Sequence, residues 1–428
     1  MRKILSITAI SMVAVASNGW GAEGGDLEKQ VRELVRQNRM LIERVTDLEK
    51  RLEIQESPAK RHYGQPAVVD QEGQAGEVDE DVAVLGSQEQ GQVAEEPGPS
   101  ILGDLRDRVE LGALVEVESN ISESFDNEDA GDITLATVEI GLDARISSWS
   151  DAHLVFLYEG GEEDEHVLLD EGTITLSDSE KIPAYLTLGK MYLPFGSYES
   201  NMISDSLPLE IGEINDTAAL VGFEARGFSG AIFVFNGDIN ETDKEDTIDV
   251  YGASLGYVHE CERLSFRAGV DWMNNIADTD GLGDNLSERE VDDADQIDDY
   301  VEGVALHLQL DYGAFSFMAE YVAALDAFQS GEIAFGNRGA EPEAWSYEIG
   351  MTCQLLDRET VFALGYQGTD EALAFELPED RYLAAVRMYL FENTSLALEY
   401  LYDKDYDKSE DGSGNHAHSA TMQLAVEF

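Results

Sequence analysis

The sequence predicts an all-β transmembrane barrel of about 16 antiparallel strands, preceded by an N-terminal α-helical coiled coil. Three observations support this fold class. Apolar and polar residues alternate in roughly ten-residue segments from residue 106 onward. The connections between these segments are short and long in turn. Beyond the N-terminal segment, no apolar stretch reaches the ~18 residues of a transmembrane helix.

The chain is strongly acidic, with 88 Asp and Glu against 27 Lys and Arg and a formal net charge of −61. This charge excludes a nucleic-acid-binding protein, because the phosphate backbone would be repelled. Hydrophobic residues make up 43% of the chain, which is too many for a disordered one. Two interpretations remain: a generally acidic, salt-adapted surface, or a channel mouth that attracts cations.

Residues 1–22 have the features of a secretory signal peptide. Arg2 and Lys3 precede an apolar run, and cleavage is expected after about residue 16 or 22. Only two cysteines occur, Cys261 and Cys353, so no disulfide framework is expected.

Residues 26–56 form a heptad repeat and are expected to be a periplasmic coiled coil that assembles a homotrimer. Asn38 is the polar member of the apolar row and would fix register and strand number. A solitary amphipathic helix packed on the body is the alternative. The row consists of Leu27, Val31, Leu34, Asn38, Leu41, Val45, Leu48 and Leu52.

Residues 57–104 are rich in Pro, Gly, Gln and acidic residues, and they predict a flexible acidic linker. The barrel is expected over 105–428. Its last segment, 418–428, places Ala420, Met422, Leu424, Val426 and Phe428 on one face and polar residues on the other. A soluble β-sandwich is the alternative, but the segments are long and their polar faces regular.

Connection lengths predict the topology. With a periplasmic N-terminus, the short turns lie on the periplasmic side and the long loops outside. The short turns are expected near 147–150, 179–183, 224–228, 311–315, 355–359 and 391–394. The long loops are expected near 119–131, 159–166, 194–217, 237–247, 274–299, 324–343, 368–379 and 403–417.

A barrel of this size encloses an aqueous channel that something must narrow. The loop 194–217 combines apolar and acidic residues, so we expect it to fold inward as a constriction loop. A lid or a trimer contact is the alternative. The candidate constriction residues are Phe195, Tyr198, Met202, Asp205, Glu210 and Glu213.

The same stretch carries a family resemblance. GKMYLPFGSYESNMISDSLPLEIGEI (189–214), with DEGTITL (170–176) before it and GFSGAIFVFNGD (227–238) after it, resembles the siderophore porin family typified by the Legionella legiobactin receptor. This resemblance implies an outer-membrane barrel that takes up a ferric siderophore. The sequence offers no plug domain ahead of the strands, which predicts passive or facilitated passage.

Strand parity predicts which charged residues face the lumen. Basic residues opposite acidic ones would create a transverse field that orients a polar solute, although solvation and ion pairing alone would also explain them. The lumen candidates are Glu110, Glu139, Asp143, Arg145, Lys190, Arg267, Asp271, His307, Glu320, Glu348, Arg381, Arg387 and Glu399.

No cofactor and no catalytic motif is evident, so an enzyme is not expected. A divalent cation could bind in an acidic loop, with candidates at 278–281, 292–295, 403–407 and the pair His416 and His418.

The sequence leaves three candidate functions. The first is a passive channel for a polar solute such as a ferric siderophore, and the second is a general cation-preferring diffusion porin. The third is a structural or adhesive barrel tethered through its coiled coil.

Overall fold

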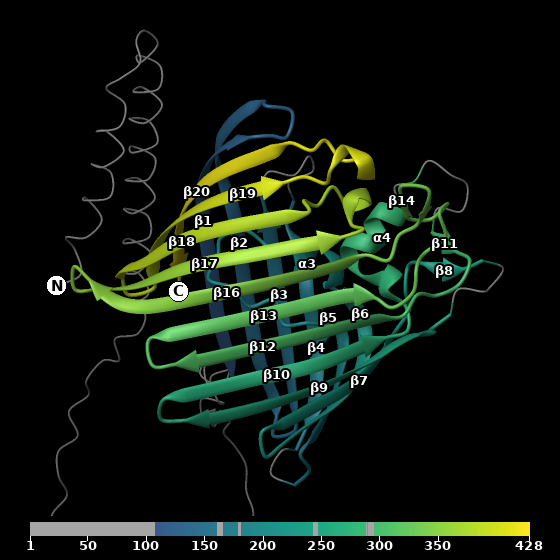
Figure 1. Cartoon of the computed structure of the whole chain (residues 1–428). Coiled ribbons are helices and arrows are strands. Elements are labelled where there is room, and N and C mark those ends of the chain that lie inside the picture. The colour runs from purple at the N-terminus through teal and green to yellow at the C-terminus, as the bar shows by residue number, and fades with distance from the viewer. Residues whose placement is uncertain (1–107, 161–165, 179–180, 243–246, 288, 290–294) are drawn as a thin grey trace, which may run out of the picture. The chain divides into compact units, whose positions relative to one another are not determined.

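The computed structural model describes residues 108–160, 166–178, 181–242, 247–287, 289 and 295–428. In these ranges, sixteen antiparallel strands form one closed barrel (Figure 1), which confirms the predicted barrel. The predicted signal peptide, coiled coil (26–56) and linker (57–104) lie outside the described residues. The barrel strands in order are β1 (Val109–Glu123), β2 (Asp129–Ser147), β3 (Ser150–Glu159), β4 (Leu168–Ser177), β5 (Ala184–Tyr192), β6 (Asn215–Ala225), β7 (Phe228–Phe235), β9 (Val250–Cys261), β10 (Leu264–Met273), β12 (Gly303–Tyr312), β13 (Phe315–Ala324), β16 (Glu343–Leu355), β17 (Arg358–Asp370), β18 (Asp380–Phe391), β19 (Thr394–Lys404) and β20 (His416–Glu427).

The first and last strands close the wall. Strand β1 pairs with β20 in antiparallel register, with Val115 opposite Val426. Beyond the end of β20, Phe428 donates its N–H to the carbonyl of Ala113 at 2.9 Å and accepts the N–H of Ala113 at 2.8 Å. The predicted alternation of the C-terminal segment therefore belongs to a strand whose two edges are both paired.

The two faces of the wall have opposite chemistry. Outward-facing Leu111 is 69% exposed and Leu364 is 58% exposed, whereas the polar side chains of Glu348 and Glu399 are buried on the inner side. Exposed apolar side chains outside and buried polar ones inside reverse the order of a water-soluble barrel. This arrangement suits a wall whose outer face contacts lipid. In the described part of the chain, no helix has both the length and the apolar character needed to cross a bilayer.

The two ends of the barrel differ in the length of their connections. At one end the connections are 148–149, 178–183, 226–227, 262–263, 313–314, 356–357 and 392–393. At the other end they are 124–128, 160–167, 193–214, 236–249, 274–302, 325–342, 371–379 and 405–415. The predicted alternation of short and long connections is confirmed. The first long loop, predicted at 119–131, was wrong, because β1 and β2 extend past the lipid-facing Ile121 and Ile133 and leave only 124–128.

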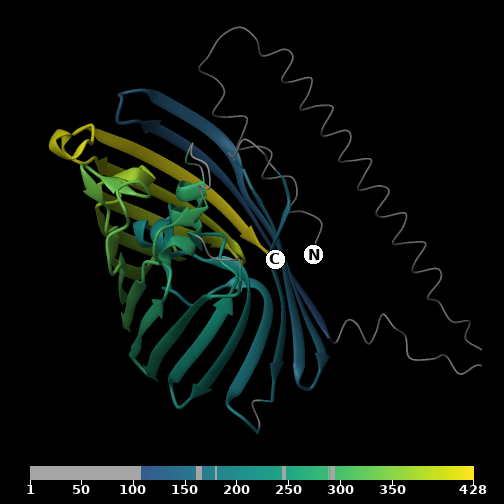
Figure 2. The same ribbon diagram turned by 90° about the vertical axis from the view of Figure 1, so that its right-hand side faces the viewer.

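Several long connections fold into the barrel and share a hydrophobic core, here termed the inner core. Phe233 and Phe235 of β7 reach it from the wall, while Val234 between them points outward. Leu207 and Leu282 join them from two short helices, which Figure 2 shows within the ring of strands. The structured pieces of the loops are α3 (Leu207–Gly212), η3 (Ile276–Asp278), α4 (Asp280–Ser287), η4 (Leu373–Phe375), η5 (Lys408–Glu410), the pair β8 (Asn240–Glu241) and β11 (Gln296–Ile297), and the pair β14 (Ala334–Phe335) and β15 (Arg338–Gly339).

Candidate functional site

The connection 193–214, here termed the constriction loop, runs from β5 along the inside of the barrel wall. A series of wall side chains accepts hydrogen bonds from it, and these side chains come from strands that succeed one another around the barrel. Gly196 donates its N–H to Oδ2 of Asp271 on β10 at 3.0 Å. On β13, Glu320 accepts the N–H groups of Ser197 and Tyr198 at 2.7 and 2.8 Å. The loop is thus fixed to the wall from its first turn.

The anchoring continues farther around the wall. Glu348 on β16 accepts the hydroxyl of Ser200 at 2.7 Å and the side-chain amide of Asn201 at 2.5 Å. Glu399 on β19 accepts the N–H of Ile203 at 2.6 Å and is also bonded by Ser204.

On β17, Oε1 of Gln367 accepts the N–H of Leu207 at 3.1 Å, in a buried bond at the start of α3. Loop amides that would otherwise be buried without partners are satisfied by wall acceptors, which makes this path much more stable than a free loop.

Apolar side chains hold the other side of the constriction loop. Phe195 is 1% exposed, and Leu207, Ile211 and Ile214 are equally buried in the inner core. Met202 packs in a second cluster with Leu383 and Leu401.

The hydroxyl of Tyr198 donates to the carbonyl of Phe195 at 2.6 Å, which closes a tight turn in which Tyr198 has φ 51°. Three of the predicted constriction residues, Phe195, Tyr198 and Met202, therefore anchor the loop rather than line an opening.

The acidic constriction residues have a different environment. Asp205 and Glu210 are exposed and Glu213 is half-buried. Burial and the neighbouring carboxylate of Asp280 on α4 raise the pKa of Glu213 to about 7. Burial and the carboxylates of Asp284 and Asp216 raise the pKa of Asp280 to about 6. The constriction loop therefore carries a negative face whose charge changes near neutral pH.

The inner wall of β1 to β4 is also predominantly acidic. These strands lie outside the arc from β10 to β19 that anchors the constriction loop, so their inner faces remain to line the passage. Their register places Glu110 beside Asp143, and Asp143 is hydrogen bonded to Nδ1 of His153 at 2.8 Å. Arg145 is the basic side chain there, 77% exposed and 3.4 Å from Asp151. Glu139 lies farther along β2 on the same face.

Most lumen arginines are already paired with oxygen atoms. The guanidinium of Arg381 binds both carboxylate oxygens of Asp403 at 2.9 and 3.0 Å and donates to the carbonyl of Asp205 at 3.3 Å. Arg387 donates to Oε1 of Gln423 at 3.3 Å and to the carbonyl of Met202 at 3.5 Å. Both arginines help to hold the constriction loop. The charge of Arg381 is offset by the carboxylate of Asp403, whereas Arg387 is bonded to uncharged oxygens.

Lys190 lies on the opposite face from the one predicted. Side chains alternate between the two faces of β5, so Lys190 lies on the same face as Leu188 and Tyr192, which are exposed on the outside of the barrel. The buried Met191 lies on the inner face. The ammonium reaches the carbonyl of Leu169 at 3.4 Å near the long-loop end of the barrel. A lysine at such a rim can keep its charge in polar surroundings while its stem follows an apolar surface.

The other lumen candidates are brought together by the wall. Arg267 is bonded to Glu199 of the constriction loop at 3.1 Å, and His307 lies 3.4 Å from Asp271. Sequence reasoning missed Gln367, and it considered Asp280 and Asp403 only as candidate cation ligands. Strand parity could have identified Gln367 and Asp403, whereas the position of Asp280 depends on how its loop folds.

The divalent-cation candidates gain no support from the described residues. No group of three or more His, Cys, Asp or Glu side chains there is arranged to hold a metal ion. Asp278 accepts the N–H of Ile239 and the amide of Asn275, and Asp405 accepts the N–H of Ser413. Part of the candidate range 292–295 lies outside the described residues.

The closed sixteen-stranded barrel with an inward loop has the fold of outer-membrane porins. It resembles the outer membrane channel DcaP of Acinetobacter baumannii, with 15% identity, a TM-score of 0.53, and coverage of 75% of this chain and 97% of that one. An anion-selective porin from Comamonas acidovorans gives 11% identity, a TM-score of 0.51 and coverage of 75% and 99%.

In sequence, the chain is similar to UPF0422 proteins. It is 25% identical to one from Legionella pneumophila over 300 residues, which are 66% of this chain and 56% of the relative. It is 24% identical to one from Coxiella burnetii over 315 residues, 72% of this chain and 67% of the relative. The match thus spans little more than half the length of the Legionella protein. No family model matches the chain.

Proposed function

We propose that this barrel is a passive channel of the Gram-negative outer membrane that admits polar solutes and prefers cations. One observation carries the proposal. Asp205, Glu210 and Glu213 on the constriction loop join an acidic inner wall, while Arg381 and Arg387 are bonded to protein oxygens. A narrow passage lined by one sign of charge concentrates counter-ions.

The anchored constriction loop and the inner core support passive passage along one part of the lumen. Together they fill one side of the lumen, and the acidic wall of β1 to β4 lies on the other (Figure 2). The porin fold of the structural neighbours favours the same function. The predicted homotrimer belongs to this proposal, with the coiled coil in the periplasm.

The test is the reversal potential of the purified full-length protein in planar bilayers under a KCl gradient. We expect the potential to have the sign that K⁺ permeability produces. Anion selectivity would refute the cation preference, and the absence of any conductance would favour a structural or adhesive barrel.

A ferric siderophore is the second candidate solute. The segment 189–214, which resembles siderophore porins, includes the entire constriction loop, so the part of the chain that carries the resemblance is also the part that narrows the passage. We expect a strain lacking the gene to take up a ferric chelate more slowly than the wild type, with recovery on complementation. Unchanged uptake for every chelate tested would leave the general channel.

A further inference from the structure

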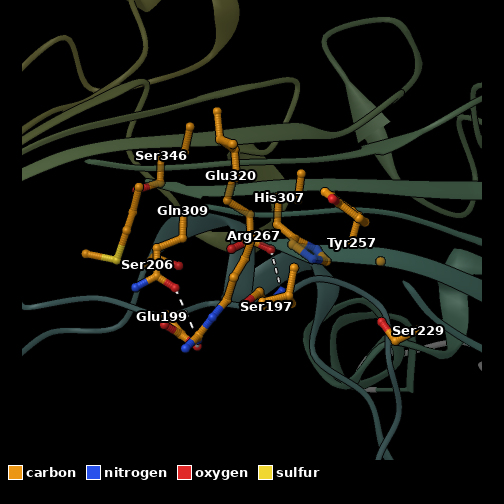
Figure 3. A pocket seen from close by; sticks show the side chains of 16 residues that line it. Ser197, Glu199, Ser206, Ser229, Tyr257, Arg267, His307, Gln309, Glu320 and Ser346 are labelled. Atoms are coloured by element: carbon orange, nitrogen blue, oxygen red, sulfur yellow. Dashed lines mark hydrogen bonds and ion pairs between the residues drawn. The ribbon is translucent and has the colours of Figure 1, made fainter. Parts of the chain in front are cut away.

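A cavity of about 120 Å³ lies between the constriction loop and the inner wall (Figure 3). Ser197 and Glu199 line it from the loop, and Ser229, Arg267 and His307 line it from strands β7, β10 and β12. Ser229 and Arg267 lie toward the short-turn ends of their strands, and His307 lies at the middle of β12. Ser206, which follows Asp205 in the chain, also lines the cavity, so the cavity reaches the acidic face formed by Asp205, Glu210 and Glu213.

Small residues on the wall create this hollow. Ser229 is opposite Gly256 in the strand register, and Gly269 follows on β10. A Cβ atom on Gly256 would lie 2.6 Å from the hydroxyl of Ser229, and one on Gly269 would lie 2.2 Å from Cε1 of His307. The imidazole of His307 thus lies flat against the wall because Gly269 has no side chain, and the space in front of it stays open.

Arg267 provides the positive group of the cavity. Its Nη1 donates to Oε1 of Glu199 at 3.1 Å and to Oε1 of Gln309 at 3.3 Å. The side chain is 45% exposed, and its Nη2 and Nε hydrogens remain for a ligand. A guanidinium presents its donors as a planar fork that matches a carboxylate.

The imidazole of His307 is a second hydrogen-bonding group of the cavity, beside the guanidinium of Arg267. Its Nδ1 lies 3.4 Å from the buried carboxylate of Asp271, and the imidazole lines the cavity. This arrangement resembles the way that a carboxylate orients an imidazole in other polar sites.

Glu199 provides the negative group. One of its oxygens accepts from Arg267, and its side chain is 49% exposed. By contrast, both oxygens of Glu320 are already engaged by loop amides. The ion pair between Glu199 and Arg267 is solvent-exposed, and such pairs contribute little to stability, so a ligand can separate its two members at small cost.

We propose that this cavity is a subsite for a small zwitterion of the α-amino-acid type. The ligand carboxylate binds Arg267 and the imidazole of His307, and its ammonium binds Glu199. The cavity is large enough, since roughly 10–15 Å³ suffices for one water and about 120 Å³ is present. A ligand with no net charge also passes an acidic constriction more readily than an anion does.

This inference rests on the proposed channel function, but direct binding tests it without transport. The detergent-solubilised full-length protein is titrated calorimetrically with L-alanine, with propionate and with propylamine. We expect saturable binding of L-alanine and at least about tenfold weaker binding of the two singly charged probes. Conductance without L-alanine binding would overturn the subsite and leave the channel intact.

Two variants identify the groups involved. Arg267→Gln and Glu199→Gln should each weaken L-alanine binding by about tenfold or more. Arg263→Gln and Glu262→Gln, in the neighbouring turn between β9 and β10, are matched controls and should leave it unchanged. Heat-modified mobility on gels verifies that each variant retains a folded barrel. Equal binding by Arg267→Gln and the wild type, or binding of propionate as tight as that of L-alanine, would overturn the proposal.

Discussion

The carboxylate of Glu399, on the last but one strand, accepts the backbone N–H of Ile203 at 2.6 Å, although 196 positions separate the two residues. This bond joins the middle of the constriction loop, which starts after β5, to β19. Among the wall strands whose carboxylates anchor the loop, β19 is the farthest along the chain. Glu399 is buried, so its contribution is not weakened by solvent. The position of the constriction loop therefore depends on side chains of the barrel wall as well as on those of the loop itself.

Glu399→Ala should loosen the constriction loop. The N–H groups of Ile203 and Ser204 lose their acceptor, at a cost of about 1–3 kcal/mol for each group left buried and unsatisfied. We expect larger and noisier single-channel currents and a lower unfolding temperature. Glu392→Ala, in the turn before β19, is the control and should resemble the wild type. Quiet wild-type currents in Glu399→Ala would mean that this anchor does not set the width.

Neutralising the acidic face should reduce selectivity with little change in pore size. The triple variant Asp205→Asn, Glu210→Gln and Glu213→Gln keeps side-chain volume and removes up to three negative charges. We expect the reversal potential to move toward zero, because fewer counter-ions are concentrated in the passage. Asp126→Asn, in the exposed loop 124–128, serves as the control. An unshifted reversal potential would place the selectivity elsewhere.

Cation preference should fall as the pH falls from about 8 to about 6. The pKa of Glu213 is raised to about 7 and that of Asp280 to about 6, so in this range Glu213 becomes mostly protonated and Asp280 partly protonated, and the passage loses negative charge. Reversal potentials at a series of pH values measure the effect. Glu213→Gln should remove the upper part of the transition. A flat profile in the wild type would contradict the assignment.

The same groups have a predictable effect on stability. Because their pKa values are raised on folding, the folded state binds more protons than the unfolded state between their unfolded and folded pKa values. Their contribution to stability is present at low pH and is lost as the pH rises through about 6 and 7. Unfolding temperatures of Glu213→Gln should therefore depend less on pH in this window than those of the wild type.

Phe195→Ala should destabilise the inner core. The side chain is 1% exposed, and removing a buried phenylalanine typically costs about 3–5 kcal/mol. We expect the constriction loop to detach at lower urea concentration and protease to cut it sooner. Phe315→Ala is the control, because that ring is 61% exposed on the lipid-facing surface. Equal protease sensitivity in the two variants would contradict a core role for Phe195.

Alternation made the barrel predictable from sequence, because a strand between lipid and water must alternate along its whole length. Asp271, Glu320 and Glu348 were placed in the lumen on this basis. The structure buries Asp271 and Glu348 inside the barrel and half-buries Glu320, and all three accept hydrogen bonds from the constriction loop. Their role as loop anchors was not predictable, since it depends on contacts across 75 to 148 positions.

Strand parity read from the sequence did not place every charged residue on the correct face of the wall. Lys190 was assigned to the lumen, but it shares the outer row with Leu188, and its side chain finds a carbonyl at the rim. Bulges add a second difficulty. The register of β1 shifts between Glu116 and Val117, so parity counted from one end of a strand does not hold at the other.

The coiled coil predicted at 26–56 should determine the oligomeric state. Its apolar heptad row buries little surface in a single helix, so association is favoured, and Asn38 within the row is the position that fixes strand number. Deleting 26–56 should convert a trimer in detergent to smaller species, measured by sedimentation velocity. Deleting 61–91 from the linker removes the same length of chain and should leave the trimer intact. A trimer that survives loss of 26–56 would mean that the barrel walls themselves hold the subunits together.

Asn38→Leu should retain association but broaden the distribution of oligomers, because the polar group that disfavours other registers is gone.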